Sequence, residues 1–178
     1  MPGAVYLESD HVTLRTIEEE DLPFLRDTIN DPAVRRYLGS RGPYNLAQEE
    51  AFFENAVTDE DTLNLLVCRD GDPAGTVGLQ TLTSSDGTSE IGIFLAEAFW
   101  GEGVGTEAAR LVTDHAFRER GRHRVEARVI EGNEASRRLF EALGYRHEAT
   151  MREAAFRDGA YVDMHWYAVL AEEWLDGT

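Results

Sequence analysis

The chain contains no lysine: all 17 of its basic residues are arginine. A chain without lysine cannot form a phosphate-binding P-loop and cannot use a Schiff-base or other catalytic lysine. Cysteine is almost absent too. Cys68 stands alone in an apolar run, so we expect a buried, inert thiol rather than a nucleophile. A single cysteine also excludes a disulfide within the chain.

Long apolar runs are missing as well. No stretch of about 18 apolar residues occurs, so we expect no transmembrane helix. The N-terminus lacks the basic-then-apolar pattern of a signal peptide. We therefore expect a cytoplasmic protein that does not bind membranes. Its 178 residues are predicted to form one domain, residues 1–178.

Positive charge is scarce, since 34 acidic residues stand against 17 basic ones and the net charge is −17. This balance argues against direct nucleic-acid binding, which needs a basic face. An acidic chain without lysine is typical of a salt-loving organism, because salt screens repulsion between exposed carboxylates. Genomic bias of a GC-rich organism, which favours arginine over lysine, is the alternative explanation.

The halophilic interpretation predicts that folding needs molar salt. We expect the melting temperature to rise by roughly 10 °C or more between dilute buffer and about 2–3 M KCl, because the salt screens carboxylate repulsion. Sucrose at matched osmolality is the control, since it does not screen charge. A melting temperature that is the same in both buffers would leave genomic bias as the explanation.

Turn signals and hydrophobic periodicity outline the secondary structure. Asp-Gly pairs at Asp70, Asp86 and Asp158 lie between apolar runs and predict three hairpins. A strand is predicted over residues 5–16, and capping signals at Thr16 and Asn45 predict helices after them. Further helices are predicted over residues 103–119 and 134–143, the second ended by a left-handed glycine. Hairpins that flank a βαβα unit indicate a mixed sheet with helices on its faces.

The segment after the central strand is the most informative. Gly101, Gly103 and Gly105 alternate between an apolar strand and a helix-forming run. Glycine allows close backbone approach, and a helix N-terminus presents free N–H groups to an anion. The pattern therefore predicts a phosphate-bearing ligand, with an ordinary strand-to-helix turn as the alternative. A dinucleotide motif needs G-x-G-x-x-G spacing, which fails after Gly105.

Three segments in this order resemble the GNAT superfamily of N-acetyltransferases. Residues 100–105 (Trp-Gly-Glu-Gly-Val-Gly) resemble its acetyl-CoA motif, (Gln/Arg)-x-x-Gly-x-(Gly/Ala), and residues 90–95 resemble the strand before it. Residues 133–145 resemble its Asn-x-x-Ser…Leu-Gly-Phe segment, and residues 157–163 are similar to the tail of the RimJ/RimL-type ribosomal-protein acetyltransferases. The likeness spans essentially the whole chain. It implies an α/β fold with a mixed, mostly antiparallel twisted sheet of about seven strands, splayed in the middle, with helices on both faces.

The resemblance also implies the ligand and its contacts. Acetyl-CoA would be the co-substrate, with its arm between two splayed strands and a backbone N–H of Phe94 or Leu95 polarising the thioester carbonyl. Asn133 would bind the pantetheine arm, and Ser136 would protonate the leaving thiolate. Because coenzyme A is polyanionic, Arg138 is also expected to meet the nucleotide phosphates, with Arg137 and Arg110 as further candidates and solvated surface arginines as the alternative. The pyrophosphate would be wrapped by Trp100, Gly101, Glu102, Gly103, Val104, Gly105 and Thr106. Asn133 as a mere helix cap and Ser136 as a surface residue are the alternatives.

The chain departs from the family pattern in three places. Trp100 stands where the motif has Gln or Arg, and Phe140 stands where many members place a tyrosine acid. Ala155 stands where some relatives have a glutamate base, so we expect Glu153, two residues away on the same strand face, to serve instead. The remaining candidates for the base are Glu148, Glu90, Glu126 and a water wire. The histidines show no metal-ligand spacing, so no metal is expected.

The acceptor is the least determined part. The RimJ/RimL likeness favours the N-terminal α-amine of a ribosomal protein. A small amine, an amino acid or an antibiotic remains an alternative, as does a non-catalytic acyl-CoA sensor. Trp166 and Trp174, taken as exposed aromatic residues near the C-terminus, are compatible with a homodimer.

Overall fold

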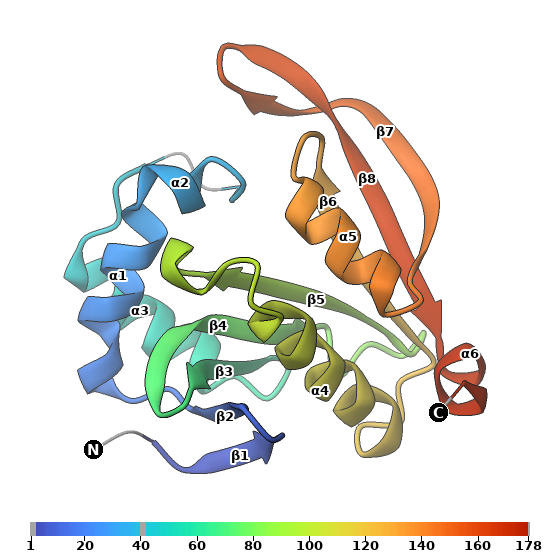
Figure 1. Cartoon of the computed structure of the whole chain (residues 1–178), viewed down its shortest axis with the longest axis horizontal. Coiled ribbons are helices and arrows are strands. Elements are labelled where there is room, and N and C mark those ends of the chain that lie inside the picture. Colours follow the sequence, from blue (N-terminus) through green and yellow to red (C-terminus); the bar gives the residue numbers. More distant parts are fainter. Residues whose placement is uncertain (1–2, 40–41, 178) are drawn as a thin grey trace.

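The computed structural model describes residues 3–39 and 42–177. It contains one eight-stranded sheet with helices on both faces (Figure 1). The elements in chain order are β1 (Val5–Glu8), β2 (Val12–Thr16), α1 (Leu22–Asn30), α2 (Pro32–Arg35), α3 (Leu46–Phe52), β3 (Leu63–Arg69), β4 (Asp72–Gln80), β5 (Thr88–Leu95), α4 (Val104–Arg118), β6 (Arg124–Ile130), α5 (Glu134–Ala142), β7 (Arg146–Arg157), β8 (Ala160–Leu170) and α6 (Ala171–Asp176).

The sheet confirms the expected mixed, mostly antiparallel architecture. Its strand order is β1-β2-β3-β4-β5-β6-β8-β7, and among the described strands only β5 and β6 pair in parallel. The sheet has eight strands rather than about seven because the predicted strand 5–16 is two strands. Ser9 N–H donates to the Val12 carbonyl at 2.9 Å and turns the chain back between β1 and β2.

The Asp-Gly signals are confirmed. Asp70 and Gly71 have φ values of 50° and 96° between β3 and β4, and Asp158 and Gly159 have 49° and 85° between β7 and β8. Two successive positive φ angles match the right-handed twist of the flanking strands. The third pair ends the longer loop between β4 and β5, where Gly87 has a φ of 74°.

The first helix begins later than predicted. Thr16 does not cap it: its hydroxyl donates to Glu18 at 2.7 Å and accepts from the Ala4 N–H at 2.9 Å. The capping box lies at Glu18 and Asp21, before a short 3₁₀ turn, and α1 starts at Leu22. The predicted box at Asn45 is confirmed, with reciprocal bonds to Gln48.

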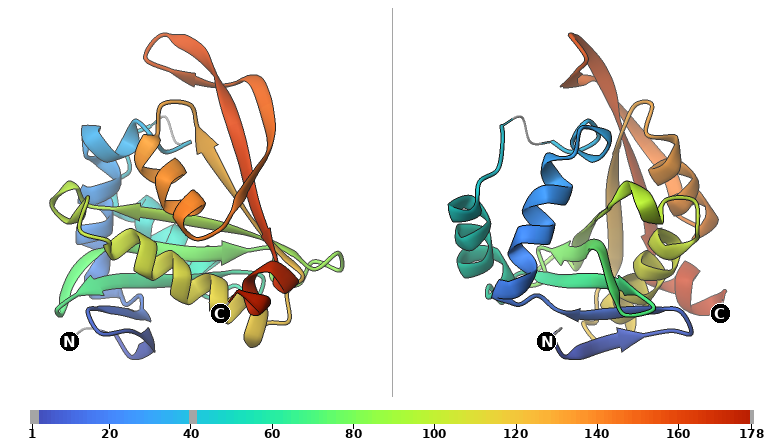
Figure 2. Two further views of the ribbon diagram at one scale, coloured as in Figure 1. Left: turned by 45° about the vertical axis from the view of Figure 1, so that its right-hand side comes forward. Right: turned by 60° about the vertical axis from the view of Figure 1, so that its left-hand side comes forward.

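Helices cover both faces of the sheet (Figure 2), and apolar side chains fill both interfaces. Along β3, Leu65 and Val67 join the large core under α4, whereas Leu66 and Cys68 join the smaller core under α1. Cys68 is fully buried, and burial raises the pKa of its thiol. The burial expected for this cysteine is therefore confirmed. None of the described helices is long and apolar enough to cross a membrane.

The β7–β8 hairpin projects beyond the body of the molecule (Figure 1). Its turn contacts the region after α2, where Arg36 pairs with Asp158 at 3.3 Å. The expected exposure of Trp174 is wrong, because its ring is buried against Phe117. The exposed aromatic side chains in this part of the chain are instead Phe156 and Tyr161 on the hairpin.

Candidate active site

The two parallel strands separate near the middle of the sheet. The β5–β6 ladder consists of three pairs, the last being Glu90 with Glu126. Beyond that pair, β5 continues to Leu95 and β6 to Ile130 without pairing to each other. We call this region the splay (Figure 2). The expected opening between two parallel strands is thus present.

The backbone of β5 alternates between β4 and the splay. The Ala96 N–H donates to the Ala74 carbonyl on the β4 side at 2.8 Å, which fixes the phase of the antiparallel ladder. Backbone N–H groups two residues apart on a strand point to the same side, so the Phe94 N–H also points to β4. The prediction of Phe94 as a donor to the thioester carbonyl is therefore wrong. Ile91, Ile93 and Leu95 direct their N–H groups toward the splay.

The loop that leads into α4, residues 100–106, is the predicted phosphate site and is called the glycine loop here. Gly101 and Gly103 have φ values of 76° and 81°, which L side chains rarely adopt, and a Cβ at either position would meet open space. Gly103 is the N-cap, and its carbonyl accepts the first helical bond from Glu107 N–H at 3.0 Å. The N–H groups that precede Glu107 in the first turn are left for a ligand.

Gly105 is a glycine for a different reason. It lies inside α4, and a Cβ there would stand 3.1 Å from Leu139 and 3.4 Å from Leu95. The missing side chain therefore allows α4 to pack closely on α5 and β5 and does not open space for a phosphate. This contact also brings the two motif-bearing helices together, although about thirty residues separate the motifs.

Trp100 ties the glycine loop to the end of the central strand. Its indole N–H donates to the Leu95 carbonyl at 2.9 Å, while the side chain remains partly exposed. Because this hydrogen bond takes the Leu95 carbonyl, it agrees with the backbone groups of Leu95 pointing toward the splay and not toward β4. Sequence reasoning missed this contact, since a tryptophan at a motif position carries no signal for its partner.

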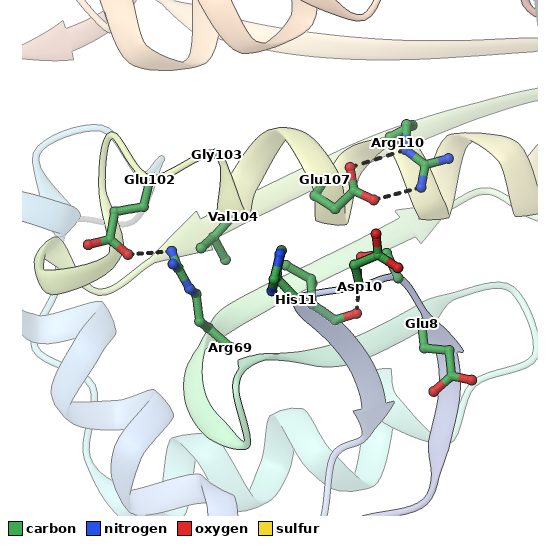
Figure 3. Close-up of a pocket in the computed structure, with 11 residues that line it drawn as sticks. Glu8, Asp10, His11, Arg69, Glu102, Gly103, Val104, Glu107 and Arg110 are labelled. Carbon is green, nitrogen blue, oxygen red and sulfur yellow. Dashed lines mark hydrogen bonds and ion pairs between the residues drawn. The ribbon is translucent and has the colours of Figure 1, made fainter.

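A hollow of about 530 Å³ lies on the β1–β2 side of the start of α4 (Figure 3). Two arginines line it, and both are paired: Arg69 with Glu102 and Arg110 with Glu107 at 2.7 Å. The Arg110 guanidinium also keeps the pKa of Glu107 below its ordinary value. Both arginines that line this hollow are therefore engaged in ion pairs within the protein.

The second motif forms the start of α5. The Asn133 side chain caps the helix by accepting the Ser136 N–H at 3.2 Å, so the predicted cap is confirmed. The cap uses the amide oxygen and leaves the amide nitrogen to a ligand. Ser136 is half-buried and Arg138 is exposed, whereas the neighbouring Arg137 is held by Glu134 and Glu141 at 2.6 and 2.9 Å.

Tyr145, the tyrosine packed against Phe140, does not replace it as an acid. Phe140 is buried, and its ring lies 5.1 Å from that of Tyr145. The Tyr145 hydroxyl hydrogen-bonds Thr113 at 2.8 Å inside the core, and burial raises its pKa. A buried phenol in that position does not serve a reaction in the splay.

The argument for Glu153 is wrong in its geometry. The β7–β8 register shifts between Met151 and Ala155, and Glu153 lies inside this bulge with a φ of 52°. A bulge breaks the two-residue alternation, so Glu153 does not share the side of Ala155. Its side chain is exposed on the projecting hairpin, and its N–H donates to Asp163 at 2.9 Å.

Two other carboxylates lie where the strands part. Both oxygens of Glu90 accept from Arg128, at 2.8 and 2.6 Å. Glu126 contacts Arg124 at 3.4 Å and keeps its second oxygen out of that ion pair. Sequence reasoning considered both glutamates but missed Arg128, whose partner lies 38 residues away.

Gly92 is the other residue that sequence reasoning missed. It is exposed although it lies in a central strand, and a Cβ there would meet nothing within 4 Å. A glycine inside the apolar run of residues 90–95 is a signal of close approach that could have revealed it.

Comparisons with known proteins identify the family of this chain. Residues 11–146 match the family model described as acetyltransferase (GNAT) domain. YdaF of Bacillus subtilis (strain 168), a provisionally assigned ribosomal N-acetyltransferase, is 27% identical, with 93% of this chain and 94% of YdaF covered. Spermidine N(1)-acetyltransferase of Escherichia coli (strain K12) is 27% identical, with 84% and 81% covered.

The fold is similar to that of a solved relative. Spermidine N-acetyltransferase of Vibrio cholerae, crystallised with CoA and spermine, superposes with a TM-score of 0.87 at 21% identity, covering 94% of this chain and 99% of that one. The chain therefore belongs to the GNAT acetyltransferase family and is an N-acetyltransferase that uses acetyl-CoA.

Proposed function

We propose that this N-acetyltransferase transfers the acetyl group of acetyl-CoA to the α-amine of a protein N-terminus, by direct attack of the amine nitrogen on the thioester carbon. No acyl-enzyme forms in this scheme. The buried Cys68 thiol and the absence of lysine are consistent with that, since neither residue type offers an enzyme nucleophile at the splay.

The observation that carries the proposal is the splay beside the glycine loop. An extended pantetheine arm would pair with the N–H groups of Ile91, Ile93 and Leu95, as an added strand would. Its pyrophosphate would lie on the free N–H groups at the start of α4. An arm that starts at the glycine loop passes Leu95 first, so the Ile93 N–H, beside Gly92, would polarise the thioester carbonyl. A single donor of this kind contributes about 3–4 kcal/mol in the transition state.

The proton transfers are assigned to two side chains. As the amine nitrogen bonds to the carbonyl carbon and the carbon–sulfur bond breaks, Glu126 takes the amine proton directly or through water. The Ser136 hydroxyl passes a proton to the departing thiolate and takes one back from solvent water, while protonated Glu126 returns its proton to solvent. Glu126 is preferred to Glu90 because Arg128 occupies both Glu90 oxygens. It is preferred to Glu153 because that residue lies in the bulge of the projecting hairpin.

The choice of acceptor rests on similarity and charge. YdaF and the E. coli spermidine enzyme are equally identical to this chain, but the YdaF match covers more of both proteins. The tail over residues 157–163 also resembles the ribosomal-protein branch. A net charge of −17 attracts any cationic amine, so charge alone does not separate a peptide N-terminus from a polyamine.

Thiol release tests the proposal. Purified protein and acetyl-CoA are mixed at high salt with a peptide that has a free N-terminus, with the same peptide N-terminally acetylated, and with spermidine. We expect release with the free peptide and none with the blocked one. Thiol release with spermidine but not with the free peptide would make a polyamine the acceptor. Binding of acetyl-CoA without thiol release for any amine would contradict acetyl transfer.

Replacing Glu126 by glutamine tests the base. We expect kcat to fall by about 10²-fold, as is typical when a general base is removed, with acetyl-CoA affinity kept. Glu153→Gln is the matched control and should change kcat less than about threefold, because its carboxylate lies outside the splay. The reverse ranking of the two variants would return the role to Glu153.

A further inference from the structure

We propose that the ion pair between Arg128 and Glu90 is a stop that limits the acyl group of the donor to acetyl. The inference rests on the proposed function, since it places the acyl end of the donor at the closed end of the splay. The pair joins the two strands that part there. Nothing in the acetyl-transfer chemistry itself requires an ion pair at this position.

The pair is held rigidly across the closed end. Arg128 lies on β6, two residues beyond the last β5–β6 rung, and reaches back to Glu90 on β5 with two hydrogen bonds of 2.8 and 2.6 Å. Its guanidinium carbon also lies 5.7 Å from the centroid of the Trp166 ring on β8. A bidentate pair backed by an aromatic ring keeps a fixed geometry.

Three sides of the closed end are then bounded. The last rung forms its floor. On the face toward α4, Ile91 and Ala127 belong to the packed apolar core. Their strand neighbours Glu90 and Arg128 point to the opposite face, where the ion pair joins the two strands, with the Glu90 side chain 26% and the Arg128 side chain 48% exposed.

The direction of the donor follows from the glycine loop. That loop comes after the open end of β5, so an arm that starts there runs down the strand toward Glu90. The acyl carbons would meet the ion pair last. Two residues from Glu90 toward the open end of β5, Gly92 leaves the same face open. Its neighbour on β4 is Gly78, which also lacks a side chain. The amine can therefore reach the thioester beside Gly92 while the acyl tail is stopped at Glu90.

Binding of acetyl-, butyryl- and hexanoyl-CoA, measured by calorimetry, tests the stop without any acceptor. We expect wild-type protein to bind hexanoyl-CoA roughly tenfold or more weakly than acetyl-CoA, the scale of methylene discrimination in a closed pocket. Arg128→Ala and Glu90→Ala should each reduce that ratio to about threefold or less, because either removes the pair. If both variants show the reduced affinity ratio, a local folding defect in one of them does not explain the result.

Arg124→Ala is the matched control. Arg124 lies on the same strand and the same face, but its bidentate partner is Glu148 on β7, and its other contact, to Glu126 at 3.4 Å, is made without Arg128 or Glu90. Because Glu126 is the proposed base, the readout for this control is ester binding and not turnover. This variant should keep the wild-type ratio. A wild-type protein that binds all three esters equally, or pair variants that discriminate as wild type does, would overturn the stop while leaving transfer intact. Failure of the wild-type protein to bind any ester would instead overturn the proposed function.

Discussion

Replacing Gly103 by valine is expected to reduce acetyl-CoA affinity by at least roughly 100-fold. Gly103 has a φ of 81° at the N-cap of α4, and a β-branched residue strongly disfavours that conformation. A valine would either displace the glycine loop or place its methyl groups in the open space beside the free N–H groups. Both results remove backbone donors from a pyrophosphate, and calorimetric titration with acetyl-CoA measures the loss.

Gly144→Val is the matched control for this substitution. Gly144 has a φ of 85°, and a Cβ there would also meet nothing within 4 Å, but it ends α5 rather than starting α4. The two variants should lose similar thermal stability, on the order of 1–2 kcal/mol for a left-handed non-glycine residue. Only Gly103→Val should lose affinity. Equal affinities in the two variants would show that the glycine loop does not hold the donor.

Replacing Gly92 by leucine is expected to lower turnover by about 10²-fold while acetyl-CoA affinity stays within about threefold, because small displacements of a reacting group have effects of that size. The backbone of Gly92 is ordinary strand, and the space above it is open, so the variant should fold. The leucine side chain would stand on the open face of the splay, where the amine must approach. Steady-state kinetics and titration of one preparation separate the two effects.

A graded series strengthens this test. Gly92→Ala should have a small effect and Gly92→Val an intermediate one, because the blocked volume grows with the side chain. The free energy of unfolding should not fall along the series, since glycine is the least favourable of these residues in a strand. Full turnover in the leucine variant would show that the acceptor does not enter beside Gly92.

Local signals in the sequence predicted elements well where one segment determines its own conformation. The Asp-Gly turn at Asp158 and the capping box at Asn45 depend on residues within a few positions of each other. The prediction failed at Thr16, where the hydroxyl found Glu18 and Ala4 instead of a helix N-terminus. The better cap lay two residues further on, at Glu18.

The candidate site shows the same division. Asn133 was assigned to the pantetheine arm with a helix cap as the alternative, and the cap exists, while the ligand contact stays a prediction. Glu153 was assigned by strand alternation, which holds only in a regular strand. The bulge that displaced it comes from pairing with β8, and nothing in residues 146–157 alone reveals that register.

The sequence by itself determined the family, most of the order of strands and helices, the position of the glycine loop and the burial of Cys68, because motifs, periodicity and turn residues act over short stretches of chain. Only the tertiary structure decided that Leu95 rather than Phe94 faces the splay, that Gly105 is a packing contact, and that Arg128 bridges to Glu90. These facts depend on strand register and on contacts between segments distant in sequence, and packing of the whole sheet selects them.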